Sequence, residues 1–325
     1  MNEVSPIRTF FDPLPVDRRL PADQLPPYAF YDDHLVEAIN VARACERPLL
    51  LLGEPGLGKS SVARGIADTI PRWTARGLKT VVTSRSVAED LLFRFDALRR
   101  FSDAQARQEV GSELAYSKPG VMWLATAPRD AEGTFEASNL DASQIAELGN
   151  AAGRVVLIDE IDKGDLAFAN DLLDLFDDRR EGFRIDRFSK TVSWDGTPFL
   201  PVITSNSESE LPDAFTRRCI AHELLAPTKE QCVDIGLVHQ KRRKAEGATR
   251  SALDLESVEK LCDAWKVEGD YDNVNTAEFI DTLDAVLAFL DAARESAGSS
   301  PFDLVGLSQK IEGIVKERRR QTSIR

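Results

Sequence analysis

The chain has 325 residues, a mass of 36.0 kDa and a net charge of −13, and 42% of its residues are hydrophobic. This composition is typical of a globular protein with a buried core and excludes wholesale disorder. The length allows about two or three domains. The negative charge argues against a general coat for DNA or RNA, because it repels the phosphates of the nucleic acid.

The cysteines and the N-terminus indicate a cytoplasmic protein. The four cysteines form no C-x-x-C pair, which favours reduced thiols in a reducing compartment. The segment Met1–Arg19 has no apolar stretch of the kind that a signal peptide needs. No stretch approaches the ~18 apolar residues of a membrane span, so we expect none.

Residues 1–27 are rich in proline, which disfavours a long helix and predicts an extended N-terminal arm. Such an arm could pack on its own domain or reach a neighbouring subunit, and the sequence leaves both possibilities open. A helix is expected to follow from Asp32 to Cys45, because Asp32 and Asp33 can cap it and an apolar stripe runs along it.

Short apolar segments then alternate with helical ones, which predicts a parallel sheet covered by helices on both faces. Leu49–Leu52 is a continuous apolar run, as expected of a strand buried on both faces. The other expected strands are Thr80–Thr83, Arg154–Ile158, Phe199–Thr204 and Cys219–Leu225. We expect an α/β fold, an αβα sandwich with a mostly parallel five-stranded sheet, over residues 28–226.

After Pro227 the pattern is helical only. Residues 228–243, 252–267, 276–292 and 303–320 each show helical spacing of their apolar residues. This predicts a separate all-helical domain over residues 227–325, which is an ordinary domain length.

A glycine-rich motif directly follows the first expected strand. It reads Gly53-Glu54-Pro55-Gly56-Leu57-Gly58-Lys59-Ser60 and fits G-x-x-x-x-G-K-[ST] at every fixed position. In this motif backbone N–H groups surround phosphate oxygens, Lys59 faces the β- and γ-phosphates, and the Ser60 hydroxyl suits Mg²⁺. We therefore expect the loop and the start of the following helix, Gly53 to Ser61, to bind ATP with Mg²⁺.

Two acids, Asp159 and Glu160, end the expected strand Arg154–Ile158. The carboxyl ends of parallel strands are where ligands bind in open α/β sheets. Asp159 is expected to hold Mg²⁺ together with Ser60. Glu160 is expected to orient or deprotonate the attacking water.

In these motifs the chain resembles the AAA+ ATPases, which implies an α/β core followed by a helical lid. The strand Val202-Ile203-Thr204-Ser205-Asn206 matches their sensor-1 segment, which implies that Asn206 holds the water and the γ-phosphate. The segment Leu211–Cys219 resembles the one that carries the arginine finger, a residue that completes the nucleotide site of a neighbouring subunit. Arg218 is the better match for this finger, and Arg217 is the second.

Within the AAA+ ATPases the chain is similar to the MoxR group. The matching segments are Thr83–Ser86, Asp90–Asp96, Lys118–Trp123 and Asp159–Lys163. This resemblance implies a chaperone or remodelling ATPase that forms a ring, most simply a hexamer, and acts on a protein client. A von Willebrand factor A-type protein is the partner that the group suggests. Two inserts, near residues 85–127 and 181–199, would lie close to a central pore or a partner surface.

One position departs from the MoxR pattern. The group carries a sensor-2 arginine at the start of a lid helix, but the corresponding segment Asn275–Glu278 has none, and Ala277 occupies the place. This departure leaves open a slow ATP-binding regulatory switch. A nucleic-acid-associated motor of the restriction or defence type is a further alternative, against which the net charge argues.

Aromatic residues in two places leave two interpretations open. Tyr28, Phe30 and Tyr31 precede the first helix, in a stretch that lies near the adenine in the family, and they could stack on the base or pack in the core. A second set could grip a substrate polypeptide or pack locally: Phe93, Phe95 and Trp123.

Overall fold

The computed structural model describes residues 11–14, 16–19, 24–106, 111–177, 182–265 and 276–295. The chain divides into two compact units. The first contains Phe11, His34–Gly53 and Lys59–Glu223, and the second contains Asp12–Asp33, Glu54–Gly58 and the chain from Leu224 onward. The helix expected over 303–320 and the arm residues 1–10 lie outside the described residues.

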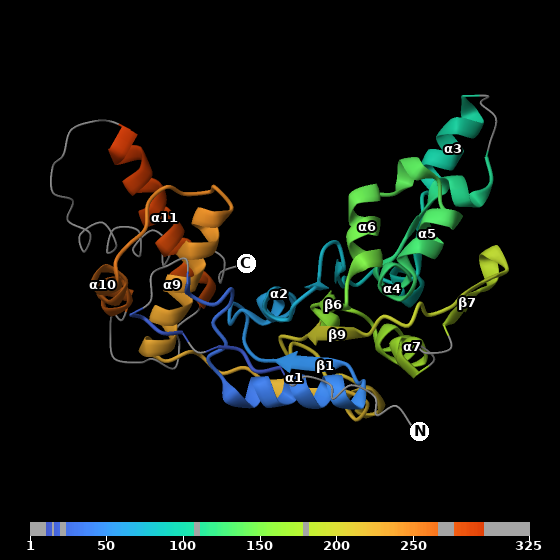
Figure 1. Ribbon diagram of the computed structural model, residues 1–325. Helices are drawn as coiled ribbons and strands as arrows, with labels where there is room; N and C mark the ends of the chain where they lie inside the picture. Colours follow the sequence, from blue (N-terminus) through green and yellow to red (C-terminus); the bar gives the residue numbers. More distant parts are fainter. Residues whose placement is uncertain are drawn as a thin grey trace, which may run out of the picture. The chain divides into compact units, whose positions relative to one another are not determined.

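A parallel sheet forms the centre of the first unit (Figure 1), with the strand order β10-β1-β9-β6-β2 and with β3 also paired to β6. All of these pairings are parallel, which confirms the predicted α/β fold with its mostly parallel sheet. The sheet has six strands rather than five, because the two-residue β2 is too short to show an apolar pattern. The strands are β1 (Leu49–Leu52), β2 (Trp73–Thr74), β3 (Lys79–Val81), β6 (Gly153–Asp159), β9 (Phe199–Thr204) and β10 (Ile220–Glu223).

Helices cover both faces of this sheet. Figure 1 shows α2 (Lys59–Thr69) on one side of the strands, and α1 (Asp33–Cys45) and α7 (Leu166–Asp177) on the other. Every residue of β6 is buried, and so are the first three of β1. This burial explains why both strands are apolar along their whole length rather than alternating.

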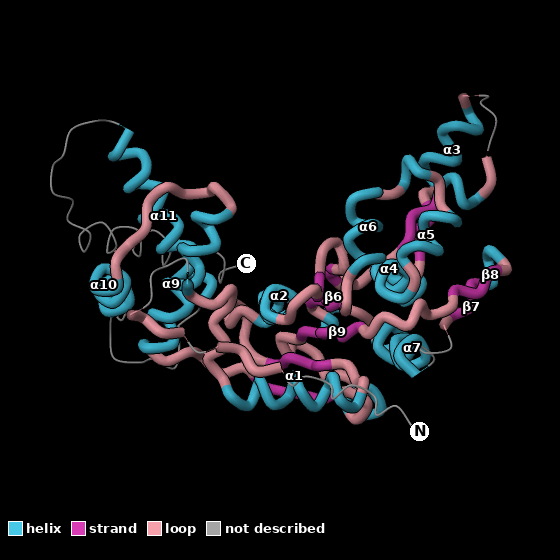
Figure 2. Tube along the Cα trace, viewed as in Figure 1, coloured by secondary structure: helices cyan, strands magenta, loops and turns pink. Residues whose placement is uncertain are grey.

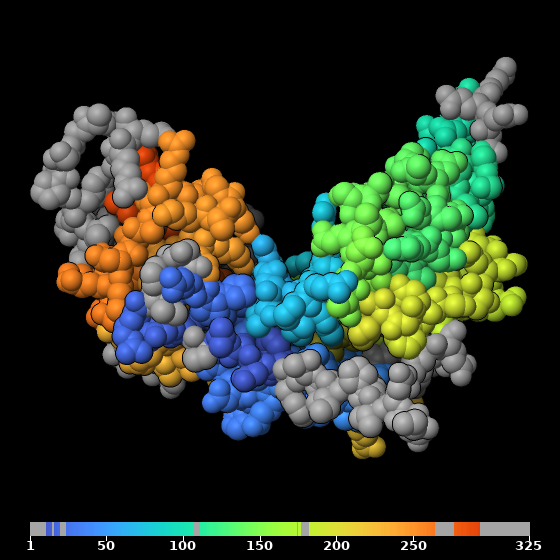
Figure 3. Space-filling view, in the orientation of Figure 1, coloured from blue at the N-terminus to red at the C-terminus, as the bar shows by residue number. Residues whose placement is uncertain are grey.

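A helical block belongs to the same unit, and in the space-filling view its residues, coloured green and teal, project from the blue and yellow residues around them (Figure 3). Two antiparallel two-stranded sheets, visible in magenta in Figure 2, belong to this region. Its helices are α3 (Ala97–Gln105), α4 (Val121–Thr126), α5 (Pro128–Thr134) and α6 (Ala142–Asn150), and its strands are β4 (Phe93–Phe95), β5 (Ser117–Pro119), β7 (Phe183–Ile185) and β8 (Lys190–Val192). Short 3₁₀ turns cover Ala88–Leu91, Glu113–Tyr116, Ala137–Asn139, Ile161–Lys163 and Asp186–Phe188.

Two of the three aromatic residues considered for gripping a polypeptide are buried in this block. Phe93 is 2% exposed and its ring centroid lies 4.6 Å from that of Phe188. Trp123 is fully buried, with its ring centroid 4.6 Å from that of Phe135. The gripping interpretation is therefore wrong for Phe93 and Trp123, which pack in the core. Phe95 is half-buried, and the Arg187 guanidinium lies 4.1 Å from its ring centroid.

A buried arginine joins this block to the sheet. Arg154, at the start of β6, is fully buried and uses all five of its N–H donors. Its guanidinium donates to both carboxylate oxygens of Asp195, at 3.1 and 2.7 Å. The remaining donors reach the carbonyl oxygens of Leu148, at the end of α6, and Ala125, in α4. One side chain thus holds two helices and the loop between β8 and β9 against the sheet.

We expect Arg154→Met to lower the free energy of unfolding by about 3–5 kcal/mol, because it leaves Asp195 and two buried carbonyl groups without their partner. Denaturant unfolding monitored by circular dichroism would measure this loss. Arg184→Met is the matched control, since Arg184 pairs with Asp186 through exposed side chains and should change stability little. A loss below about 1 kcal/mol for Arg154→Met would contradict the structural role assigned to Arg154.

Helices α9 (Lys229–Ala245), α10 (Leu255–Trp265) and α11 (Thr276–Glu295) make up the described helices of the second unit. Leu25 and Ala29 are buried in the same apolar cluster as these helices, and Arg18 forms an ion pair with Asp234 at 2.7 Å. The described part of the N-terminal arm therefore packs on helices of its own chain. Among the described residues, no helix has the length and apolarity that a membrane span requires.

Candidate nucleotide site

The glycine-rich motif forms the loop between β1 and α2. Gly56 and Gly58 have φ angles of 86° and 87°, a left-handed conformation that glycine adopts at little cost. Helix α2 begins at Lys59, which is 6% exposed. The Lys59 ammonium donates to the Gly53 carbonyl oxygen at 2.6 Å, so it lies over the loop that the motif assigns to phosphate.

A carboxylate at the end of β6 lies next to this loop. The Ser60 hydroxyl donates to Asp159 Oδ1 at 2.6 Å, although the two residues are 99 positions apart in the sequence. The Thr204 hydroxyl, at the end of β9, donates to the same oxygen at 2.7 Å. Strands β6 and β9 are neighbours in the sheet, so their carboxyl ends bring both side chains to the start of α2.

The second oxygen of this carboxylate has a charged partner. Lys79, in β3, places its ammonium 2.8 Å from Asp159 Oδ2. Burial by itself raises the pKa of Asp159, but the hydrogen bonds from Lys79, Ser60 and Thr204 outweigh it and hold the pKa below its usual range. Asp159 is therefore a carboxylate at neutral pH, as a ligand for a divalent cation must be.

Glu160 follows in a strained backbone conformation. Its φ and ψ angles are 60° and 49°, in the left-handed region that non-glycine residues rarely adopt. The Glu160 N–H donates to the Thr204 hydroxyl at 2.9 Å, which fixes this turn. Its carboxylate lies 3.1 Å from the Lys163 ammonium, and this hydrogen bond raises the pKa of Lys163. Such strain costs about 1–3 kcal/mol and gathers at functional sites.

Asn206 is tied to the same motif through Asp162. Asp162 is 6% exposed, and its Oδ2 accepts the backbone N–H of Asn206 at 3.2 Å and of Glu208 at 3.1 Å. The Ser209 hydroxyl donates to the Asp162 carbonyl oxygen at 2.6 Å. The loop that carries the expected sensor residue is therefore held by the 3₁₀ turn that follows Glu160.

These donors fit a magnesium ion. Ser60 and Asp159 supply oxygen ligands, which Mg²⁺ prefers. In proteins Mg²⁺ is commonly bound by one or two carboxylates together with substrate phosphates. In the described part of the chain, no group of three or more His, Cys, Asp or Glu side chains could hold a metal by itself.

The two candidates for the arginine finger lie between α8 and β10, away from Asp159. Arg217 and Arg218 follow α8 (Asp213–Thr216) and are both exposed. Arg218 comes just before β10, whose first residue, Ile220, pairs with Leu49 at the start of β1. The phosphate loop follows the end of β1, so the arginines and the phosphate loop lie at opposite ends of the strands.

The start of α11, where the sequence leads us to expect a sensor-2 arginine and finds none, contacts Gly56 through its backbone. The Ala277 N–H, in the first turn of α11, donates to the Gly56 carbonyl oxygen at 2.9 Å, and both residues belong to the second unit. In that unit Tyr28 and Phe30 pack on each other with ring centroids 4.6 Å apart. The adenine contact expected of this aromatic stretch stays a prediction.

Three residues of the site had no assigned role at the level of sequence: Lys79, Thr204 and Asp162. Thr204 ends the strand Phe199–Thr204, and Asp162 lies in the turn that follows Glu160, so the available signal was a polar residue inside each of two recognisable motif segments. Lys79 carries no such signal, because only the register of β3 on β6 brings it to Asp159.

Comparison with known proteins gives one family match. The family model of the AAA domain (dynein-related subfamily) matches residues 48–219. Comparison with curated proteins finds no significant match. Among solved structures, three variants of Thermotoga maritima RuvB match with TM-scores of 0.43, 0.43 and 0.42 and identities of 18%, 16% and 18%. They cover 86% of this chain and 68%, 68% and 67% of theirs.

The family assignment rests on the sequence model, which covers more than half of the chain and includes every residue of the site from β1 to Arg218. AAA+ proteins generally bind ATP and Mg²⁺ and typically assemble into rings. The chain belongs to the dynein-related subfamily of AAA domain proteins, a subfamily that includes the MoxR-like proteins.

Proposed function

We propose that this protein is a ring-forming ATPase of the MoxR group that hydrolyses ATP to remodel a partner protein in the cytoplasm. One observation carries the proposal. The carboxylate of Asp159 accepts hydrogen bonds from Ser60, at the start of the phosphate-loop helix, and from Thr204, at the end of the sensor strand. Three motifs that are far apart in the sequence thus meet on one carboxylate at the carboxyl edge of the sheet.

Each residue of the proposed site has a separate task. Lys59 supplies a positive charge to the phosphates, and Ser60 with Asp159 would hold Mg²⁺, which neutralises phosphate charge when bound. Glu160 accepts a proton from the attacking water. The Asn206 amide holds that water against the γ-phosphate.

Arg218, or Arg217 as the second candidate, stabilises charge on the phosphoryl group bound by a neighbouring subunit. A ring, most simply a hexamer, follows from this division of the site between subunits. The partner that the MoxR resemblance suggests is a von Willebrand factor A-type protein.

One observation favours a slower variant of this function. Ala277 stands where the group carries an arginine, and its backbone N–H already binds the Gly56 carbonyl oxygen. A lid without the arginine contributes no positive side chain there to the γ-phosphate. A regulatory ATP switch with low turnover is therefore the second candidate, and steady-state phosphate release per subunit separates it from a fast remodelling ATPase.

We expect Lys59→Ala to weaken ATP binding about 10- to 100-fold, because a charge-assisted hydrogen bond to the phosphates is lost. Fluorescence anisotropy with a labelled ATP analogue would measure the affinity. Lys118→Ala removes the same charge from an exposed position in β5 and serves as the control. ATP binding of Lys59→Ala at the wild-type affinity would rule out the phosphate loop as the nucleotide site.

A further inference from the structure

The carboxylate expected to hold Mg²⁺ already has a cation beside it. Lys79 Nζ lies 2.8 Å from Asp159 Oδ2, while Ser60 and Thr204 donate to Oδ1. Both carboxylate oxygens are therefore occupied by donors of the chain itself. The side chain of Asp159 is 9% exposed, and a carboxylate withdrawn so far from water needs a charged or hydrogen-bonding partner.

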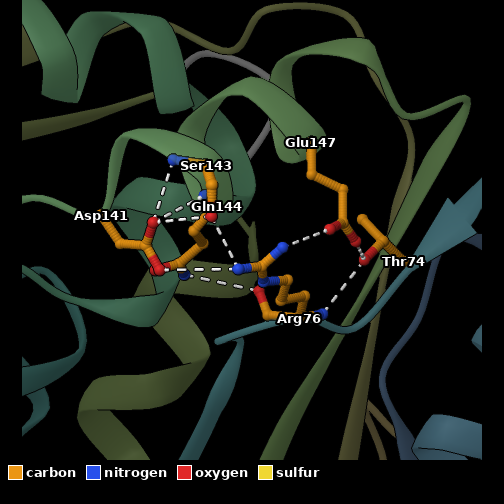
Figure 4. Close-up of polar contacts among 6 residues, drawn as sticks. All are labelled: Thr74, Arg76, Asp141, Ser143, Gln144 and Glu147. Atoms are coloured by element: carbon orange, nitrogen blue, oxygen red, sulfur yellow. Dashed lines mark hydrogen bonds and ion pairs between the residues drawn. The ribbon is translucent and has the colours of Figure 1, made fainter.

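The backbone of Lys79 is held by the pairing of β3 with β6 and by the turn that precedes β3. In the register of β3 on β6, Lys79 pairs with Leu157 and Val81 pairs with Asp159. The turn that leads into β3 is held on α6: the Arg76 guanidinium donates to Glu147 at 3.0 Å and to the Ser143 hydroxyl at 2.7 Å. Figure 4 shows this network.

The side chain of Lys79, in contrast, is open to solvent. Its side chain is 52% exposed, and an ammonium on a flexible four-carbon stem is readily rehydrated. The ammonium can therefore leave Asp159 for solvent without any change in β3. Lys79 has a fixed backbone and an exposed ammonium group, so another cation could displace this ammonium from Asp159.

We propose that Lys79 is a built-in counter-ion that occupies Asp159 before the metal binds and competes with Mg²⁺ for it. The inference rests on the proposed function, since it concerns the metal of the ATP site. Two cations beside one carboxylate repel each other, so the lysine lowers the affinity of the site for Mg²⁺. The phosphates of a nucleotide supply the negative charge that offsets this repulsion, so the lysine makes metal binding depend on bound nucleotide.

The test is the Mg²⁺ requirement of nucleotide binding. The affinity for labelled ADP is measured at Mg²⁺ concentrations from chelator-treated buffer to saturation, for the full chain and for Lys79→Met. We expect the Mg²⁺ concentration that gives half of the gain in affinity to fall about tenfold in Lys79→Met. Without metal and nucleotide, the same variant should melt at a lower temperature than the wild type, because Asp159 loses its counter-ion.

Three further variants make this result specific. Lys79→Gln also removes the charge but keeps a hydrogen-bond donor, so it should show the same shift even where Lys79→Met folds poorly. Lys79→Arg keeps the charge and should keep the wild-type Mg²⁺ requirement. Lys260→Met removes a lysine of similar exposure, 56%, from an ion pair with Glu256 on α10, and should leave the requirement unchanged.

The outcomes separate this inference from the proposed function. If the wild type binds labelled ADP but Lys79→Met and Lys79→Gln need the same Mg²⁺ concentration or more, Lys79 only orients Asp159 and the inference is overturned while the nucleotide site stands. If the wild type binds no nucleotide at any Mg²⁺ concentration, the proposed function itself fails, and this inference fails with it.

Discussion

Glu160→Gln is expected to bind ATP as well as the wild type does and to hydrolyse it about 10²- to 10⁴-fold more slowly, the range by which a positioned general base accelerates a reaction. The amide keeps the size of the side chain and can still contact water. It cannot accept a proton, so only the activation of the attacking water is lost.

The backbone conformation at Glu160 should not change in this substitution. The strained turn is held by the bond from the Glu160 N–H to the Thr204 hydroxyl, which does not involve the Glu160 side chain. The ion pair with Lys163 joins side chains that are 36% and 42% exposed, and such a pair contributes at most about 1 kcal/mol to stability. The variant should therefore fold as the wild type does.

Phosphate release and binding of labelled ATP measure the two quantities separately. Glu208→Gln is the matched control, because Glu208 is exposed and its backbone N–H binds Asp162 near the same edge of the sheet. Its turnover should stay close to that of the wild type. A Glu160→Gln variant that hydrolyses ATP at the wild-type rate would show that another group activates the water.

The fold could be predicted from the sequence where the apolar pattern was long enough. Leu49–Leu52 and Phe199–Thr204 have the expected bounds, because runs of buried residues in a parallel sheet are apolar along their whole length. The strand expected over Thr80–Thr83 lies at Lys79–Val81 instead, since its residues alternate between buried and exposed. The two-residue β2 has no pattern to detect.

The site could be predicted as far as its motifs reach. The phosphate loop, Asp159 and Glu160 are recognisable because their chemistry fixes both residue type and spacing. Lys79 and Asp162 could not be assigned in this way, because their contacts depend on strand register and on the path of the loop after β9. The roles of Phe93 and Trp123 could not be decided from the sequence, because a buried ring and a ring that grips a substrate can have the same local sequence.

Arg218→Ala is expected to bind ATP nearly as the wild type does and to lose about 10³- to 10⁵-fold of its turnover, the effect of arginine fingers in related nucleotide hydrolases. The topology is the reason to expect that the arginine serves a neighbouring subunit rather than its own. Arg218 precedes β10, at the end of the sheet where Ile220 pairs with Leu49, whereas Asp159 ends β6 at the opposite end. Strands β10 and β6 are also three positions apart, about 14 Å across the sheet.

A mixing experiment tests whether the arginine acts between subunits. Glu160→Gln lacks the base but keeps its arginine, and Arg218→Ala lacks the arginine but keeps its base. In mixed rings, some interfaces join an intact Glu160 to an intact Arg218 of the neighbour, so the mixture should recover phosphate release that neither variant shows alone. Arg217→Ala, which changes the adjacent exposed arginine, is the matched control and should keep its activity if Arg218 is the finger.

Other outcomes of these experiments would assign the role to Arg217 or contradict the arginine finger or the ring. Loss of activity in Arg217→Ala, with recovery on mixing, would transfer the role to Arg217, whose carbonyl oxygen accepts a hydrogen bond from Arg47 at the same end of the sheet. Full activity of both alanine variants would contradict a finger in this segment. A protein that stays monomeric with ATP and hydrolyses it at a rate per subunit independent of concentration would contradict the ring, because the opposite ends of one sheet could not then meet in a single site.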